Sequence, residues 1–285
     1  MSLKSSSELR NSAKTLGLVL LISLSTVACK VSQKTPESEA NIPKKTPLSE
    51  QLVMSTLWFQ NSLEAQQLYI QSYELAKIKM MANEIKEKGK LPSAVVLDID
   101  ETVLDNSAFE ARLVQNEKNY TPQGWAAWVN EANAPALPGA VDFINFAQKN
   151  DIDVFLISNR KEELLSPTLV NLKKVGVNIA ADHVLLKTDT SNKDARRANV
   201  KSAHKVILYI GDQLTDFASI YDSPQDVTML PETKKDSLQD LLNQEFILLP
   251  NPMYGTFEQA VYPQSHLSDE EKSQARKKAL NTKGL

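Results

Sequence analysis

The amino-acid sequence predicts an α/β fold: a doubly wound parallel sheet with helices on both faces and a smaller helical cap or additional α domain. Two short apolar runs, Ala94 to Ile99 and Val206 to Ile210, are rich in β-branched and aliphatic residues and are typical of strands buried on both faces. Segments with apolar residues at helical spacing alternate with such runs, which is typical of parallel sheets. An acidic pair follows each of the two runs, where parallel sheets bind their ligands.

Residues 1–28 have the pattern of an export signal. Three basic residues precede the apolar stretch from Leu16 to Val27, and the small residue Ala28 stands directly before Cys29. The stretch is too short for a transmembrane anchor, since a helix needs about 20 apolar residues to cross a bilayer. We therefore expect residues 1–28 to be a signal peptide that is removed on export.

The segment from Ser25 to Cys29 resembles the lipobox of bacterial lipoproteins, with Thr26 where Leu is usual. The resemblance implies that Cys29 is lipidated and becomes the first residue of the mature protein. Several acyl chains on one residue exceed what stable membrane attachment requires, so the folded body would be held at the membrane by its lipid anchor only. Lys30 follows the cysteine and favours the outer membrane of a bacterial cell envelope, or the cell surface, over the inner membrane.

A polar tether is expected over residues 29–48, because this segment contains three prolines and no hydrophobic periodicity. The folded domain is expected over 49–265, which exceeds the length that one hydrophobic core requires. Its first part, about 49–88, has an apolar stripe near helical spacing that predicts one long or two consecutive helices with the stripe in the core. The stripe comprises Leu52, Trp58, Leu63, Leu68, Tyr69, Tyr73, Ala76, Met80 and Ile85. Residues 266–285 are charged and are expected to form a frayed tail.

Further strands are predicted at three apolar runs: Val154 to Ile157, Val184 to Leu186 and Phe246 to Leu249. The best-marked helix has Ser166 as its N-cap, Pro167 in its first turn and Gly176 just past its end. A partly helical insertion over about 105–138 follows the first acidic strand. It is placed where a cap would cover a site at the strand ends.

The two acidic pairs, Asp98 with Asp100 and Asp212 with Asp216, predict a metal and phosphate site. Two like charges about 4 Å apart repel by roughly 4 kcal/mol at an effective dielectric constant of about 20, so converging carboxylates need a cation or protons. Mg²⁺ suits such a site because it takes one or two carboxylates, keeps several waters and accepts phosphate oxygens. The alternative for either pair is a turn or a helix N-cap, where aspartate is also common.

Composition excludes several other classes of phosphate-cleaving enzyme. The three histidines, His183, His204 and His266, lie far apart and in no Arg-His-Gly motif, and they are too few for a His-rich two-metal site, so we interpret them as surface or core residues. Cys29 is the single cysteine, which excludes an intrachain disulfide and a Cys-x5-Arg phosphatase loop. A formal net charge of −3 does not favour binding of a nucleic acid polymer. A carboxylate nucleophile remains.

Four segments follow one another along the chain: LDIDETVLDN, LISNR, SNKDARR and IGDQLTDF. On these segments the chain resembles the haloacid-dehalogenase (HAD) superfamily of phosphatases, and it is most similar to the class C acid phosphatases of the bacterial lipoprotein e type, from about Ser49 to Tyr262. The resemblance implies a HAD-like fold and a Mg²⁺-dependent acid phosphatase that hydrolyses phosphomonoesters through an aspartyl-phosphate. It also implies a small-molecule substrate and a homodimer.

Position by position, the resemblance implies a role for each acidic residue. Asp98 matches the nucleophile that attacks phosphorus. Asp100 matches the general acid and base, and because residues i and i+2 of a strand face the same side, both carboxylates would reach one substrate. Asp98, the backbone carbonyl of Asp100 and the carboxylate of Asp212 match the metal ligands. Asp216 matches a residue that orients bound water and Lys193.

The second and third motifs supply the phosphate contacts that the resemblance implies. Ser158 matches a hydroxyl that holds the phosphoryl oxygens together with neighbouring amides, with Asn159 among the substrate-binding residues and Arg160 supporting the loop. Without the family pattern, Ser158 would be assigned to strand-end capping. Lys193 matches the ammonium group that offsets charge on the phosphoryl group and the nucleophile. Lys187 is the rival because it also lies at a strand end, but Lys193 precedes the Asp-Ala-Arg run of the motif.

Substrate choice is expected to depend on the segment from Pro250 to Gly255, which resembles the loop that brings a stacking tyrosine to the site of nucleotidase members. Tyr254 would stack a nucleobase at about 1 to 3 kcal/mol without choosing among bases. Trp128, with Trp125 and Phe109, would form the opposite wall, and ordinary core packing is the alternative for these aromatics. The expected substrates are nucleoside 5'-monophosphates. The alternatives are broad activity on sugar or aryl phosphates, and a non-catalytic surface lipoprotein that keeps the fold.

Overall fold

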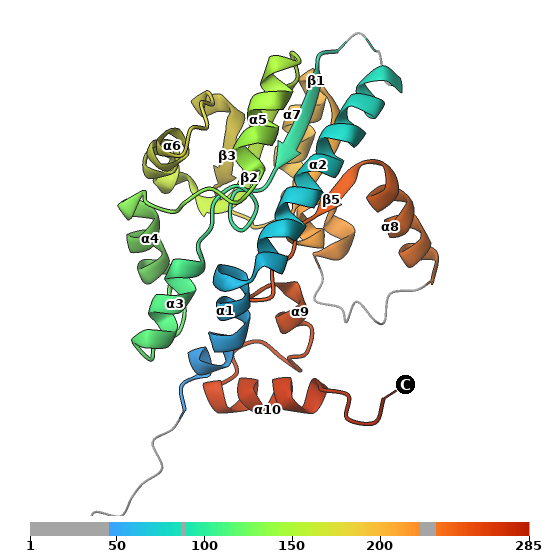
Figure 1. Cartoon of the computed structure of the whole chain (residues 1–285). Coiled ribbons are helices and arrows are strands. Elements are labelled where there is room, and N and C mark those ends of the chain that lie inside the picture. The colour runs from blue at the N-terminus through green and yellow to red at the C-terminus, as the bar shows by residue number, and fades with distance from the viewer. Residues whose placement is uncertain (1–45, 87–88, 90, 223–231, 285) are drawn as a thin grey trace, which may run out of the picture. The chain divides into compact units, whose positions relative to one another are not determined.

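The computed structural model describes residues 46–86, 89, 91–222 and 232–284 (Figure 1). The predicted signal peptide, the lipidation site at Cys29 and the tether up to residue 45 lie outside the described residues. Among the described helices, none combines the length and the apolar character that a membrane crossing requires. The elements are η1 (Leu48–Leu52), α1 (Val53–Asn61), α2 (Leu63–Lys86), β1 (Ser93–Leu97), α3 (Ser107–Gln115), α4 (Pro122–Glu131), α5 (Ala140–Lys149), β2 (Asp153–Lys161), η2 (Glu162–Leu164), α6 (Leu165–Lys174), η3 (Ala181–His183), β3 (Val184–Lys187), α7 (Asp194–Ala203), β4 (Lys205–Gly211), η4 (Leu214–Asp216), η5 (Ser219–Tyr221), α8 (Glu232–Gln244), β5 (Phe246–Leu248), α9 (Thr256–Gln259) and α10 (Asp269–Ala279).

The described strands form one parallel sheet in the order β3-β2-β1-β4-β5. The chain runs outward from β1 to β2 and β3, and then returns to β4 on the other side of β1. The strand order therefore reverses between β1 and β4, and such a reversal opens a crevice at the carboxyl ends of the strands, where α/β sheets bind ligands. The predicted doubly wound parallel sheet is confirmed.

Helices cover both faces of this sheet because successive residues of a strand point to opposite sides. Val95 of β1 belongs to a buried apolar cluster with Tyr73 of α2 and Phe143 of α5. Its neighbour Val96 belongs to a separate cluster with Val200 of α7. One face is thus covered by α2 and α5, and the other by α7.

The predicted strands are all present among the described residues, each with its bounds shifted by one or more residues. β1 ends at Leu97 instead of Ile99, and β2 continues beyond Ile157 to Lys161. Hydrophobicity did not predict the extension of β2 because it contains the polar residues Ser158 and Arg160. Both are buried in the structure, and their hydrogen bonds to other segments replace the water that they lose.

The predicted N-terminal helical segment consists of η1 followed by two consecutive helices, α1 and α2. Tyr69 and Tyr73 of the apolar stripe are buried, but Leu63 and Ile85 are 70% and 69% exposed, so the expectation that the whole stripe lies in the core is wrong. The buried residues of α2 recur every three or four positions, and Leu63 and Ile85 fall outside that face.

The start of α6 differs from the prediction. Ser166 is not the N-cap, because the 3-10 helix η2 leads directly into α6 and the α-helix already begins at Leu165. Gly176 lies just past the end of α6 and has a φ of 93°, a conformation that glycine adopts without strain.

The expectation of a frayed C-terminal tail is wrong for residues 269–279, which form α10. A reciprocal pair of hydrogen bonds between Ser268 and Glu271 caps its first turn. Arg276 of α10 forms an ion pair with Glu258 of α9 at 2.6 Å and donates to Gln51 of η1 at 3.0 Å. These contacts connect the charged segment to two parts of the domain that are distant in sequence.

Candidate active site

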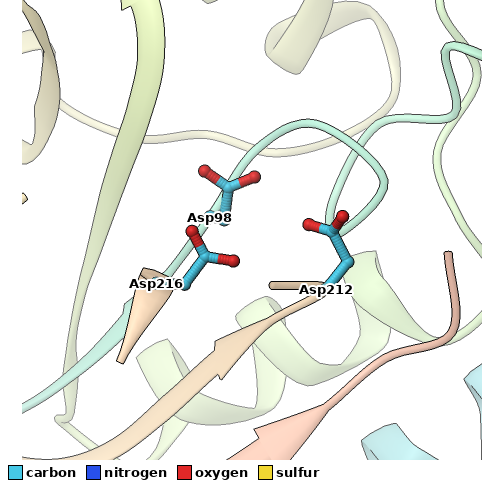
Figure 2. Close-up of side chains that lie close together, drawn as sticks. All are labelled: Asp98, Asp212 and Asp216. Carbon is cyan, nitrogen blue, oxygen red and sulfur yellow. The ribbon is translucent and has the colours of Figure 1, made fainter. Parts of the chain in front are cut away.

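The acidic residues lie at the reversal of strand order between β1 and β4. Asp98 directly follows β1, and its backbone N–H donates to the carbonyl of Ile210 in β4 at 3.0 Å, which ties the two strand ends together. Asp212 directly follows β4, and Asp216 ends the short helix η4. Figure 2 shows the side chains of Asp98, Asp212 and Asp216 close together.

One carboxylate oxygen from each of Asp98, Asp212 and Asp216 lies within 4.8 Å of the others, a spacing that suits ligands of one metal ion. All three residues are buried, with 8%, 9% and 8% of their surface exposed. Burial raises the pKa of the Asp98 carboxyl well above its usual range, and Lys193 opposes this shift. Burial and the nearby Asp216 raise the pKa of Asp212 to about 7, against hydrogen bonds from Asn251 and Gln213.

Burial is the largest cause of these shifts, and an excess of negative charge adds to it. In the described part of the site, four carboxylates lie at the carboxyl ends of the strands, and two cations form ion pairs with them. The carboxylates are those of Asp98, Asp100, Asp212 and Asp216, and the cations are Lys193 and Arg160. With all four carboxylates ionised, the four negative and two positive charges leave a net charge of −2. This equals in size the charge of one divalent ion, so this donor set fits a divalent metal.

Lys193 is the central cation of the cluster. Its Nζ forms ion pairs with Asp98 and with Asp216, the latter at 2.7 Å, and it donates to the carbonyl of Ile157 at 2.7 Å. Burial alone would lower the pKa of Lys193, but the carboxylates of Asp216 and Asp98 outweigh it and raise the pKa above its ordinary value. The rival Lys187 instead lies 3.4 Å from Ser191 Oγ and does not line the site.

Asp212 is oriented by side chains from three segments. Gln213 Nε2 and Asn251 Nδ2 each donate to its Oδ2 at 2.9 Å, and the Thr102 hydroxyl donates to its Oδ1 at 3.4 Å. Asn251 belongs to the segment from Pro250 to Gly255 and was not predicted to contact the acidic residues. Its position between Pro250 and Pro252, which restrict the backbone, was the available signal.

Asp100 makes a different set of contacts from Asp98. Arg160 donates to its Oδ1 from Nε at 3.0 Å and from Nη2 at 2.8 Å, Ser158 Oγ donates to its Oδ2 at 3.1 Å, and Asn106 Nδ2 donates to Oδ1 at 2.9 Å. The Arg160 side chain is 1% exposed, so this ion pair is shielded from water. Arg160 was predicted only to support a loop, whereas the structure makes it the cation bound to Asp100.

The expectation that Asp98 and Asp100 share a strand pleat is wrong, because β1 ends at Leu97. Both residues instead lie in the turn after β1, where Glu101 has a φ of 55°. Two tyrosines of α2 hold this turn: the Tyr69 hydroxyl donates to the carbonyl of Glu101 at 2.6 Å, and Tyr73 donates to the next carbonyl at 2.7 Å. Helix α2 therefore positions the turn that carries both aspartates.

Two arginines of α7 hold the other loops of the site. Arg196 donates to the Ser158 carbonyl at 2.5 Å and to Asn159 Oδ1 at 2.8 Å. Arg197 donates to the backbone carbonyl of Asp216 at 2.9 Å. Because Lys193 is the N-cap residue of the same helix, α7 places one cation of the site and fixes the loops after β2 and β4.

Gly211 allows Asp216 to approach the end of β4. A Cβ atom at this position would lie 2.4 Å from Asp216 Oδ2 and 2.6 Å from its Cβ, closer than atoms can pack. Asp216 also accepts from the backbone N–H of Gln213 at 3.0 Å, which closes the turn. The glycine in the fourth motif is therefore explained by space for this carboxylate.

The site opens into a cavity of about 600 Å³, within the usual range for small-molecule sites. Its lining includes the acidic residues, Asn159, Lys193, Trp125 and Tyr254. Trp128 does not line it: this side chain is buried, and its Nε1 donates to Asn106 Oδ1 at 2.8 Å. The prediction that Trp128 contacts the substrate is therefore not supported, and Trp128 instead orients an amide that binds Asp100.

The other predicted aromatics divide between the cavity and the core. Phe109 is 4% exposed and packs edge-to-face against Trp125, with ring centroids 5.2 Å apart. Trp125 lines the cavity, and so does Tyr120, which sequence analysis did not single out. Tyr254 reaches the cavity beside Asp212, because Gln213 bonds to Asp212 and donates to the Tyr254 carbonyl at 3.3 Å.

Comparison with known families gives a match over residues 18–257 to the family described as HAD superfamily, subfamily IIIB (Acid phosphatase). Among solved structures, the class C acid phosphatase from Bacillus anthracis is 37% identical, with a TM-score of 0.76 over 82% of this chain and 98% of that chain. The same enzyme with tungstate bound is 36% identical, with a TM-score of 0.77.

Among curated relatives, vegetative storage protein 1 of Arabidopsis thaliana is 28% identical over 144 residues, 48% of this chain and 52% of the relative. Acid phosphatase 1 of Solanum lycopersicum is 25% identical over 166 residues, 56% of this chain and 57% of the relative. The chain thus spans little more than half the length of the curated relatives it matches.

Proposed function

Because the chain belongs to the acid phosphatase family of HAD subfamily IIIB, we propose that it is a Mg²⁺-dependent acid phosphatase that hydrolyses nucleoside 5'-monophosphates through an aspartyl-phosphate. The observation that supports this most directly is the arrangement of Asp98 and Asp100. Both open on one cavity, and each is bound to a different buried cation, Lys193 or Arg160.

In the first step, a carboxylate oxygen of Asp98 attacks the phosphorus of the substrate, and the bond from phosphorus to the ester oxygen breaks. Protonated Asp100 gives its proton to the leaving alkoxide, so the alcohol leaves neutral. Lys193, Ser158 and the backbone N–H groups near Asn159 offset the charge on the phosphoryl oxygens. Because Asp100 must enter this step protonated, the reaction is expected to be fastest at acidic pH.

In the second step, Asp100 takes a proton from water, and the resulting hydroxide attacks the aspartyl-phosphate. The bond from phosphorus to the Asp98 oxygen breaks, which releases inorganic phosphate and restores both carboxyl groups. Arg160, Ser158 and Asn106 hold the Asp100 side chain for both proton transfers. Dividing one difficult displacement into two steps is the advantage of a carboxylate nucleophile.

Asp98, the backbone carbonyl of Asp100 and Asp212 are the residues that would hold Mg²⁺, with Asp216 beside them and bound to Lys193. When bound, the ion would neutralise the excess charge of the carboxylates and orient the phosphoryl group. Oxygen donors of this kind suit a hard cation.

For substrate choice, Tyr254 and Trp125 line the cavity and supply aromatic faces on which a base can stack. A solved relative is described with tungstate bound, an oxyanion of phosphate-like charge and shape. The runner-up is broad activity on sugar or aryl phosphates, with Tyr254 only structural. The ratio of kcat/KM for AMP to that for ribose 5-phosphate distinguishes the two.

The proposal includes a location. Residues 1–28 are proposed to direct export, and lipidated Cys29 to anchor the protein to the outer membrane of a bacterial envelope or to its surface. A homodimer is proposed on the family resemblance alone. Incorporation of a labelled fatty acid that is lost in Cys29→Ser tests the anchor.

The first experiment measures phosphate release from AMP and from p-nitrophenyl phosphate by the full chain at acidic pH, with Mg²⁺ and with EDTA. We expect release that depends on the cation and falls by about 10⁴-fold or more in Asp98→Asn, since removal of a nucleophile has effects of this size. Asp153→Asn is the matched control, because Asp153 lies at the amino end of β2, and it should keep full activity.

The alternative of a non-catalytic binding module is supported by the name of one relative, a vegetative storage protein. No release from either substrate with any divalent ion, by a protein that circular dichroism shows to be folded, would establish this alternative and end the enzymatic proposal. Equal release by wild type and Asp98→Asn would overturn the assignment of the nucleophile.

A further inference from the structure

A second carboxyl group lies in the cavity apart from the catalytic cluster. Glu110 of α3 is 7% exposed and lines the cavity. Its pKa is raised to about 7 by burial and by Glu258, with no hydrogen bond among the causes. Within the described residues, the Glu110 carboxyl therefore has no hydrogen-bonding partner. A ligand group that forms a hydrogen bond with this carboxyl would therefore not have to displace a protein partner.

Its neighbours are engaged with one another. Glu258 forms an ion pair with Arg276 at 2.6 Å. The Tyr262 hydroxyl donates to Glu258 and accepts from Arg276 Nε. Arg276 therefore pairs with Glu258 and not with Glu110. The arrangement leaves one carboxyl in this part of the cavity free to bind a substrate group.

Tyr120 interacts electrostatically with both Asp100 and Glu110. The pKa of Tyr120 is raised by burial and by the negative charges of Asp100 and Glu110, so this ring lies near both carboxyl groups. Tyr120 and Trp125 both line the cavity, and Phe109, which precedes Glu110 on α3, packs against each of them, at 6.3 and 5.2 Å between ring centroids. An aromatic surface thus connects the phosphate site to Glu110.

We propose that Glu110 is a specificity-determining residue that binds the hydrogen-bonding edge of a nucleobase whose phosphate is held at Asp98. This inference rests on the proposed function and names the part of the substrate that the site distinguishes. Stacking on Tyr254 or Trp125 tolerates every base, whereas a carboxyl group selects by its donors and acceptors.

The selection depends on protonation. A neutral carboxyl group presents one O–H donor and one carbonyl acceptor, which complement the ring-nitrogen acceptor and amino donor of adenine or cytosine. An ionised carboxylate presents two acceptors, which complement the two N–H donors on the edge of guanine. The site therefore prefers AMP and CMP when Glu110 is protonated and shifts toward GMP when it ionises.

The charged and titratable groups that line this part of the cavity are Glu258 on α9, Lys272 and Arg276 on α10, and Tyr120 after α3. Glu258 is paired with Arg276. The pKa of Tyr120 is raised, so its hydroxyl stays protonated near pH 7. Because the pKa of Glu110 is about 7, the protonated form prevails below that pH and the ionised form above it.

The test compares kcat/KM for AMP and GMP on both sides of pH 7 in wild type, Glu110→Gln and Glu110→Leu, with p-nitrophenyl phosphate as a substrate without a base. The ratio of kcat/KM for AMP to kcat/KM for GMP is unaffected by metal binding and proton transfer, because both substrates share these steps. One hydrogen bond supports a difference of about tenfold. In wild type we expect a ratio of about 10 at acidic pH that falls to 1 or below at alkaline pH.

Glu110→Gln keeps one donor and one acceptor at every pH, so its ratio should stay near the acidic wild-type value. Glu110→Leu should bring the ratio to about 1 at all pH values, since stacking alone tolerates any base. Activity on p-nitrophenyl phosphate should change less than twofold in both variants, which shows that they are folded. A wild-type ratio that is independent of pH and unchanged in Glu110→Leu overturns the inference while leaving the phosphatase intact. Absence of all phosphatase activity in wild type is instead a failure of the proposed function.

Discussion

The cavity has two walls of different origin. The functional groups of one wall lie at the carboxyl ends of β1, β2 and β4, and those of the other lie on η1, α3, α9 and α10. We call these the strand-end wall and the helical wall. The strand-end wall comprises Asp98, Asp100, Asn159, Arg160, Asp212 and Asp216, together with Lys193 at the start of α7. The helical wall comprises Leu48, Leu52, Glu110, Leu113, Glu258, Lys272 and Arg276.

The two walls differ in how their charges are balanced. In the strand-end wall both buried cations bind carboxylates directly, and the remaining negative charge suits a metal ion. In the helical wall, Arg276 is paired with Glu258, and Glu110 has no hydrogen-bonding partner among the residues that the structure describes. Under the proposed function, the strand-end wall performs the chemistry and affects kcat, while the helical wall selects the substrate and affects KM.

The largest effect is expected for the central cation of the strand-end wall. Lys193→Met removes the ammonium group that binds Asp98 and Asp216, and kcat on p-nitrophenyl phosphate should fall by about 10³-fold, the effect of losing a group that stabilises transition-state charge. Steady-state kinetics measure the loss, and thermal unfolding checks the fold.

Lys187→Met is the matched control, because Lys187 also lies at a strand end, but its Nζ lies 3.4 Å from the exposed Ser191 and the residue does not line the cavity. It should keep kcat within twofold of wild type. Similar losses in the two variants would show that the lysine of the third motif has been assigned wrongly.

An intermediate effect is expected for Arg160, which positions Asp100. Arg160→Lys keeps the charge but loses the fork that donates from both Nε and Nη2, so kcat should fall about tenfold, and Arg160→Met should lose about 100-fold. KM for p-nitrophenyl phosphate should change less than threefold, because Asp100 acts in proton transfer.

Arg112→Gln serves as the control for loss of an arginine ion pair. Its pair with Glu131 is exposed, and such pairs contribute little, so kcat and stability should both stay near wild type. If Arg160→Met lowered only the unfolding temperature and left kcat unchanged, Arg160 would be a structural residue and not a positioning one.

The smallest effect is expected in the helical wall. Arg276→Gln removes the ion pair with Glu258, so KM for AMP should rise about threefold while kcat on p-nitrophenyl phosphate stays constant, since a half-buried ion pair contributes about 1 kcal/mol or less. Lys277→Gln, the exposed neighbour on α10, should change neither value. A fall in kcat for Arg276→Gln would contradict the division of roles between the walls.

Much of the strand-end wall could be predicted because its residues stand at short, fixed distances from apolar strands. Asp98 and Asp212 each follow a run of aliphatic residues, and parallel pairing brings such positions together. Roles that depend on partners from other segments could not be predicted. Arg160 was one polar residue among several until β2 placed it beside Asp100, and Trp128 was assigned to the substrate until the structure showed it buried against Asn106.

The sequence by itself determined the α/β class, the order of the strands along the chain and the family, because hydrophobic periodicity and short motifs are local properties. Only the tertiary structure decided where β1 ends, that α10 folds against α9 and η1, and that Glu110 lines the same cavity as the acidic residues. The physical reason is that burial of a polar or charged side chain depends on partners supplied by distant segments, and these partners have no periodic signal in the sequence. Apolar strands carry such a signal, and the residues of the helical wall do not.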